Sequence, residues 1–155
     1  MVTHLFKKGH LDPAAQQRAL KDIGQKIVSV VPKEWERITY TREAVIDHAT
    51  SIVVVELQDG TSVRKSPPPS ISLVADDLRA GMYQEGKGTW FSMEYVITRP
   101  GKFAVNYNYD DDPGITFPTA FGFTRDLEYF PRDEENIPGW LREKLVEEAE
   151  GRATE

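Results

Sequence analysis

Two strand–turn–strand patterns constrain the fold of this chain more than any other feature of its sequence. In the first, the β-branched run Ile52–Leu57 precedes Asp59-Gly60, a dipeptide suited to a tight hairpin turn, and a returning strand over Thr61–Lys65. In the second, apolar and polar residues alternate over Phe91–Thr98, and the alternation resumes after the turn residues Arg99–Lys102. Strands joined by such short turns run antiparallel, so the sequence predicts an antiparallel sheet.

The second of these hairpins predicts which side chains face the core. Phe103, Val105, Tyr107 and Tyr109 share one face of the returning strand, and we expect that face to be buried. The alternate residues point the other way and are expected to face outward: Ala104, Asn106, Asn108 and Asp110.

Helical patterns flank the strands. Asp12 followed by Pro13 is a helix-start signal, and apolar residues at helical spacing continue to Val31, before Pro32. A second helix is expected over Ser70–Gln84, a third segment has helical spacing over Ala120–Phe130, and a last helix opens near Pro138 and carries Trp140 and Leu141. A further strand is expected over Trp35–Glu43.

These elements together predict a single α+β domain. We expect an antiparallel sheet of about five strands, with helices packed at the N-terminus, in the middle and at the C-terminus. Residues 1–11 are expected to be a flexible leader, residues 12–150 the domain, and residues 151–155 a polar tail.

Composition narrows the possible functions. The chain has 155 residues, no cysteine and a formal net charge of −6. The lack of cysteine excludes disulfides, thiolate catalysis and cysteine–zinc sites. A negative charge disfavours nonspecific nucleic-acid binding, which needs clustered basic residues, and suits a basic protein partner. The apolar runs are too short to span a bilayer and no signal peptide is visible, so we expect a soluble, cytoplasmic protein with no membrane partner.

No motif for catalysis, a cofactor or a metal emerges. The three histidines, His4, His10 and His48, have no partners at triad or ligand spacing. The acidic run Asp110–Asp112 lacks the glycine and glutamate that a calcium-binding EF-hand loop requires. We therefore predict that the protein is not an enzyme, with no catalytic, cofactor-binding or metal-binding residue.

The aspartate run is the best candidate for partner binding. It is either a solvated turn or an anionic patch that faces basic residues of another protein. Arg132 lies beside Asp133–Glu135 and either braces that loop, which we favour, or reaches a partner carboxylate. The residues that we predict to contact a partner are Asn106, Asn108, Asp110, Asp111 and Asp112, which are expected to point outward, together with Arg132.

The order of short motifs resembles the YezG-like immunity proteins, which are the antitoxin partners of bacterial polymorphic toxins. The resemblance covers about residues 20–145, and its closing pattern is most similar to actinobacterial versions. The matching segments are Val31–Trp35, Gly101–Phe103, Asn106–Asp110, Asp126–Arg132 and Ile137–Leu141. The resemblance implies a protein without enzymatic activity that binds its cognate toxin, 1:1, in the producing cell. Related toxins include nucleases and NAD-degrading enzymes, and a resemblance does not fix which toxin is bound.

Two other functions remain open at this point. The chain could be a small-molecule-binding or enzymatic α+β domain whose site assembles only in three dimensions. It could also be a nucleic-acid mimic, although its acidic residues are dispersed apart from one short run.

Overall fold

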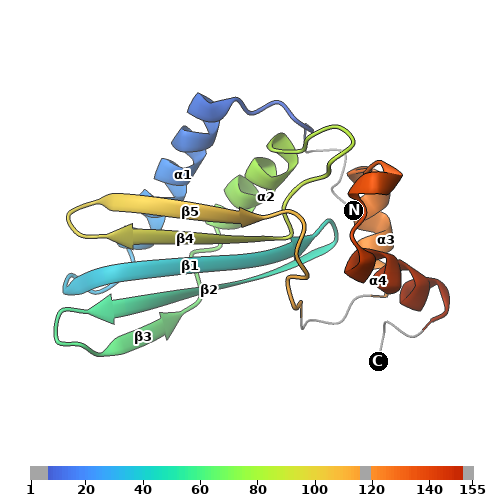
Figure 1. The fold of residues 1–155 in the computed structure, drawn as a ribbon. Helices are drawn as coiled ribbons and strands as arrows, with labels where there is room; N and C mark the ends of the chain where they lie inside the picture. The colour runs from blue at the N-terminus through green and yellow to red at the C-terminus, as the bar shows by residue number, and fades with distance from the viewer. Residues whose placement is uncertain (1–6, 116–119, 152–155) are drawn as a thin grey trace.

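A five-stranded antiparallel sheet, with strand order β3-β2-β1-β4-β5, forms the centre of the computed structural model (Figure 1). The structure describes residues 7–115 and 120–151. Along the chain the elements are α1 (Pro13–Val28), β1 (Trp35–Val45), β2 (His48–Leu57), β3 (Ser62–Lys65), α2 (Ile71–Gly81), β4 (Ser92–Thr98), β5 (Lys102–Asn108), α3 (Gly122–Tyr129), a 3-10 turn (Glu134–Asn136) and α4 (Gly139–Ala149). The predicted α+β fold, with helices at both ends and in the middle, is confirmed.

Two predicted helices end earlier than their apolar spacing indicates. The Asp12 carboxylate caps α1 by accepting a hydrogen bond from the Ala15 N–H (2.8 Å), as predicted, but the helix stops at Val28 rather than Val31. The residue before a proline avoids the helical conformation. Pro32 therefore disfavours a helical Val31, and the last turn of the predicted helix does not form. Helix α2 ends at Gly81, because Gln84 is already paired with Gly88 in a small bridge.

One face of the sheet carries the main core. Side chains from alternate positions of the strands pack there against α1 and α2, and removing this apolar surface from water is the main stabilising contribution. The core consists of fully or nearly fully buried residues: Leu20, Ile23, Ile27, Trp35, Ile38, Tyr40, Val53, Val55, Ile71, Ala75, Leu78, Trp90, Met93, Tyr95 and Ile97.

The opposite face of the sheet, here called the open face, has only one buried residue in the part of the chain that the structure describes, Val45 at the end of β1. The strand register aligns its side chains in rows across four strands. One row runs Ile52, Thr41, Glu94 and Asn106, and the next runs Thr50, Glu43, Ser92 and Asn108. In Figure 1 most of α1 and α2 lies above β5, their lower ends pass behind the strands, and no helix or strand is drawn in front of the sheet.

Strand β5 lies at one edge of the sheet, which changes the expected burial of its side chains. Val105, Tyr107 and Tyr109 pack against the core but are only partly buried. Phe103, expected to be buried, is 42% exposed. The alternation correctly predicts which face these residues share, but periodicity does not reveal that β5 has a neighbouring strand on one side only.

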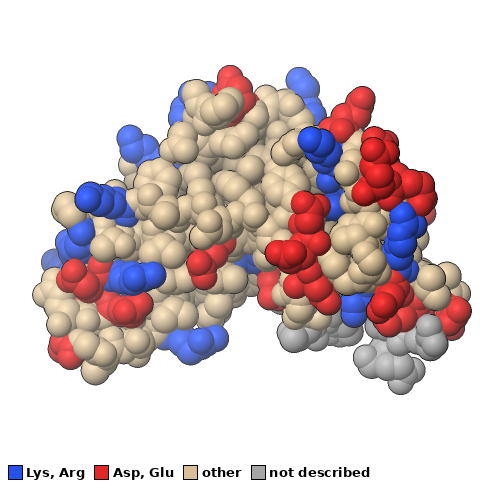
Figure 2. All heavy atoms as spheres, viewed as in Figure 1, with Lys and Arg blue, Asp and Glu red and all other residues tan. Residues whose placement is uncertain are grey.

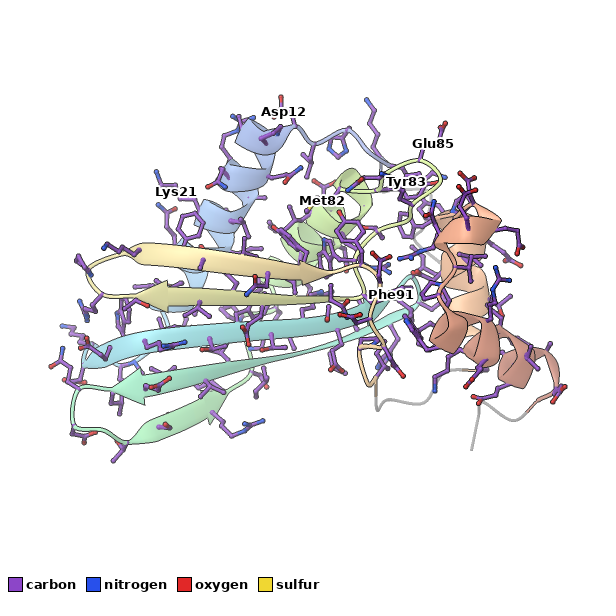
Figure 3. All side chains as sticks on the ribbon, viewed as in Figure 1. Asp12, Lys21, Met82, Tyr83, Glu85 and Phe91 are labelled. Atoms are coloured by element: carbon purple, nitrogen blue, oxygen red, sulfur yellow. The ribbon has the colours of Figure 1, made fainter. Side chains whose placement is uncertain are left out.

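A buried ion pair and a second small core join α3 and α4 to the end of the sheet. Arg79 of α2 binds Asp126 of α3 through both guanidinium nitrogens (2.7 and 2.9 Å). Phe91 lies where the strands end against these helices (Figure 3), with its ring 5.8 Å from that of Phe123 and 5.3 Å from that of Trp140. The Glu148 carboxylate, buried in α4, accepts hydrogen bonds from the N–H groups of Phe123 and Thr124 (3.0 and 2.8 Å).

The ends of the chain are described in part. Residues 7–11 run beside the end of α2, where the Gly9 and Leu11 N–H groups donate to the carbonyls of Ala80 (2.9 Å) and Gly81 (3.1 Å). The rest of the expected leader, residues 1–6, and residues 152–155 of the expected tail lie outside the described residues. The flexibility of both ends stays a prediction.

Candidate protein-binding surface

The aspartate run forms an ordered turn at the end of β5. The Asn108 side chain accepts a hydrogen bond from the Asp111 N–H (2.8 Å) and donates one to the Asp111 carbonyl (2.8 Å). The Asp112 carboxylate accepts a bond from the Gly114 N–H (3.0 Å), and Gly114 has a positive φ of 65° that a glycine adopts without strain. All three aspartates are exposed, so the turn presents their carboxylates to solvent in a fixed arrangement.

Asp110 is held from two directions. Its carboxylate accepts a hydrogen bond from the Arg132 guanidinium (3.1 Å), and its backbone carbonyl accepts one from the Trp140 indole N–H (2.8 Å). The carboxylate side chain is nevertheless 76% exposed. Asp110 is therefore positioned by the C-terminal segments while its charge remains available to a partner.

Arg132 braces this turn from inside the protein. Its side chain is only 1% exposed. Besides Asp110, its guanidinium donates to the carbonyls of Tyr109 (2.5 Å), Asn136 (3.0 Å) and Thr89 (3.3 Å). Bracing was the favoured interpretation, but the partners are these four groups rather than the neighbouring Asp133–Glu135. A direct contact between Arg132 and a partner stays a prediction, and the burial of the side chain disfavours it.

Asn106 and Asn108 connect the turn to the open face. Asn106 pairs across the strands with Glu94, and Asn108 pairs with Ser92, which in turn pairs with Glu43. Partial burial of the Glu43 carboxyl raises its pKa above the ordinary value. Sequence reasoning missed Glu43 as part of this surface, because only the strand register shows that it lies beside the residues of β5.

The predicted partner-binding residues thus come together, with Arg132 beneath the surface and the other five on it. Figure 2 shows acidic side chains gathered over α3, α4 and the segment that follows β5. Residues 108–155 hold 13 acidic and 5 basic residues, a net charge of −8, whereas residues 1–107 hold 12 acidic and 14 basic residues, a net charge of +2. The surface formed by Asn106, Asn108, Asp110, Asp111 and Asp112, together with Glu43 and Glu94, is called the acidic surface below.

A groove of about 620 Å³ adjoins the acidic surface on the core side of β5. Its walls include Lys87, Tyr107, Asp110, Asp111 and Asn136. The Tyr107 hydroxyl has no hydrogen-bond partner among the described residues, and burial, with smaller contributions from Tyr109 and Tyr95, raises its pKa to about 12. The Tyr107 phenol that lines this groove is therefore neutral. The charged and polar groups of the groove are its carboxylates, its amides and Lys87.

The remaining titratable groups form no recognisable chemical site. Within residues 7–115 and 120–151, no group of three or more histidine or acidic side chains is placed to hold a metal ion. His10 lies 4.0 Å from Asp77 on the surface, and its other ring nitrogen is 2.8 Å from the Lys7 carbonyl. In the same part of the chain, no helix is long and apolar enough to cross a membrane.

Comparison with known proteins gives one distant relative. No protein-family model matches the chain. The immunity protein YezG of Bacillus subtilis (strain 168) is 24% identical over 106 residues, which cover 57% of this chain and 70% of that protein. The chain is therefore similar, at a distance and over part of its length, to a protein named as an immunity protein, which agrees with the resemblance carried by its short motifs.

Proposed function

We propose that this protein is an immunity protein, which binds a cognate bacterial toxin domain in the cytoplasm of the producing cell and inhibits it without catalysing a reaction. The similarity to an immunity protein over 57% of the chain carries this proposal. The order of the short motifs is consistent with it.

We infer that the acidic surface is where the toxin binds, as a 1:1 complex. The side chains of Asn108, Asp110 and Asp112 are held by internal hydrogen bonds, so these three lose little side-chain entropy when a partner docks. A basic toxin surface is the complementary partner, since opposite charge raises the association rate and excludes wrong partners. Nucleases, which bind a polyanion, and NAD-degrading enzymes, which bind a dinucleotide with an anionic pyrophosphate, are the toxin classes that we propose.

Co-expression with the toxin domain encoded beside the gene tests the function. The toxin alone should arrest growth, and the pair should restore growth and co-purify with a mass that fits one copy of each chain. A toxin domain from a different system is the matched control and should remain toxic. Failure to rescue growth and to co-purify would refute the proposed function.

A further inference from the structure

The two edges of the sheet differ in how they are protected. An exposed edge strand offers unpaired backbone groups to other chains, and natural proteins commonly blunt such edges with charge, proline or short length. The β3 edge has these features: four residues, with Arg64 and Lys65 in the strand and Pro67-Pro68-Pro69 after it. β5 has seven residues, with no charged residue or proline from Phe103 to Asn108.

β5 is also free to pair. Within the described residues it pairs with β4 alone, and none of its own residues is buried. An added strand could therefore extend the sheet at this edge without moving an element of the fold.

A groove opens at each end of β5, and both open on the side of the sheet that faces α1 and α2. The first, called the Phe103 groove, measures about 480 Å³ and is mostly apolar, with Val28, Trp35, Ile97 and Phe103 among its walls. Lys21 of α1, labelled in Figure 3, also lines it. The second is the groove of about 620 Å³ described above, called here the Asp111 groove. Phe103 and Tyr107 face the same side of β5, so one added strand can reach both grooves.

We propose, building on the proposed function, that the toxin supplies an extended segment that pairs with β5. Main-chain hydrogen bonds give affinity in this mode of recognition, and pockets for alternate side chains give specificity. The segment places an apolar side chain in the Phe103 groove and a lysine or arginine in the Asp111 groove. Because successive side chains of a strand point to opposite faces, the two anchors lie an even number of residues apart, about four or six at roughly 3.4 Å per residue.

Charge favours a basic anchor in the Asp111 groove. Asp110 keeps most of its carboxylate exposed although it contacts Arg132, and Asp111 and Asp112 add two more exposed carboxylates. The cations nearby are Lys87 in the groove wall and the buried Arg132. The excess of carboxylates at this end of β5 selects a cation as the incoming side chain.

A second copy of this chain fits the same edge poorly. Antiparallel pairing of two β5 strands about Val105 would bring Phe103 of the second copy against Tyr107, at the Asp111 groove. The polar groove would then receive an apolar ring, and the Phe103 groove would receive the Tyr107 phenol of the second copy. A toxin segment with one apolar and one basic anchor satisfies both grooves.

Amide hydrogen exchange and two matched variants test the pairing, with the neighbouring-gene toxin domain as the probe. In the complex, amides of β5 between residues 103 and 108 should gain at least about tenfold protection, while β3 amides stay unchanged. Phe103→Ser should weaken toxin binding at least about tenfold. Val30→Ser, at an apolar residue of equal exposure (43% against 42%) outside the groove, should change binding less than about twofold.

The outcomes separate this inference from the proposed function. If the wild-type protein binds the toxin but β5 amides gain no protection, or Phe103→Ser binds as well as Val30→Ser, the edge proposal is refuted and the proposed function stands. If the wild-type protein does not bind the toxin, both are refuted. If β5 amides are protected in the protein alone, and light scattering shows a dimer, the edge belongs to a second copy and the toxin segment is excluded.

Discussion

Arg79 and Asp126, which lie 47 residues apart, form a two-point ion pair in the interior, with side chains 4% and 5% exposed. Arg79 also donates to the Trp90 carbonyl (2.6 Å), and its guanidinium lies 5.2 Å from the centre of the Phe130 ring. The pair therefore fixes α3 against α2 and the end of the sheet.

Removing one member of this pair should destabilise the protein strongly. Asp126→Ala leaves a buried guanidinium without its counter-charge, and we expect the free energy of unfolding to fall by about 3–5 kcal/mol. Urea denaturation followed by circular dichroism measures this change. Asp47→Ala is the control: it breaks the ion pair with Arg125, whose side chain is 53% exposed, and should cost about 0–1 kcal/mol. Equal effects of the two variants would contradict the structural role given to Asp126.

Glu148 should matter more than its neighbour Glu147. Glu148→Ala leaves two N–H groups at the start of α3 and the Thr124 hydroxyl without their acceptor, and we expect a loss of about 2–4 kcal/mol in unfolding free energy. Glu147→Ala, on the same helix, should change stability by less than about 0.5 kcal/mol. Thermal and urea unfolding of the two variants side by side decide the matter, and a Glu148→Ala protein as stable as Glu147→Ala would rule out this capping role.

Tyr95 and Tyr107 should respond differently to loss of their hydroxyl groups. The Tyr95 hydroxyl donates to the Leu20 carbonyl (2.8 Å), so Tyr95→Phe should cost about 1 kcal/mol. The Tyr107 hydroxyl has no partner, so Tyr107→Phe should be neutral or slightly stabilising. Equilibrium unfolding in urea measures both, and a Tyr107→Phe variant that loses as much stability as Tyr95→Phe would contradict the difference in bonding.

The same tyrosines should make stability fall at alkaline pH. Burial raises the pKa of Tyr95 and of Tyr107 to about 12, whereas a phenol in the unfolded chain ionises near pH 10. The unfolded state therefore loses these protons first, so the stability linked to these groups is fully present below about pH 10 and is lost as pH rises from about 10 to about 12. Absorbance at about 295 nm, which reports tyrosinate, should show two late titrations, and Tyr107→Phe should remove one of them.

Neutralising the aspartate run should slow toxin association while the fold persists. Asp110→Asn, Asp111→Asn and Asp112→Asn, made together, keep the hydrogen-bond acceptors of the turn but remove three charges. We expect a lower association rate that is most visible at low salt and shrinks as salt screens the charges. Stopped-flow or surface-plasmon measurements at two salt concentrations check this.

The control for that triple variant removes the same charge elsewhere. Glu34, Glu36 and Glu56 are exposed and lie near the opposite end of the sheet, where β1 begins and β2 ends. Replacing them with glutamine should leave the association rate much closer to that of the wild type. If both triple variants slow association equally, overall charge rather than the acidic surface governs the encounter.

Local patterns in the sequence predict the elements, but not the contacts that hold the aspartate turn. The cap at Asp12 and the alternation along β5 depend on neighbouring residues, so both can be read from the chain. Arg132, in contrast, contacts Asp110, Tyr109 and Thr89, which lie 22, 23 and 43 residues away. Nothing in local spacing favours those partners over the adjacent Asp133–Glu135.

Three of the short motifs that carry the family resemblance meet in the structure around Asp110. Tyr109 and Asp110 belong to one motif, Arg132 to another and Trp140 to a third, and the structure joins all three through hydrogen bonds around Asp110. Their order along the chain is readable from the sequence, whereas their meeting point follows only from how α3 and α4 pack on the sheet. The residues of these motifs therefore support the aspartate turn. The exposed carboxylates that could bind a partner are a separate feature of the same turn.

The open face separates the residues that fold the protein from those that can meet a partner. Most of its side chains are exposed or only partly buried, so substitutions there carry small folding penalties, whereas changes on the opposite face disrupt packing against α1 and α2. Under the proposed function, this face could therefore diverge, residue by residue, in step with a changing toxin. The packed core could then stay constant while the specificity for the partner changes.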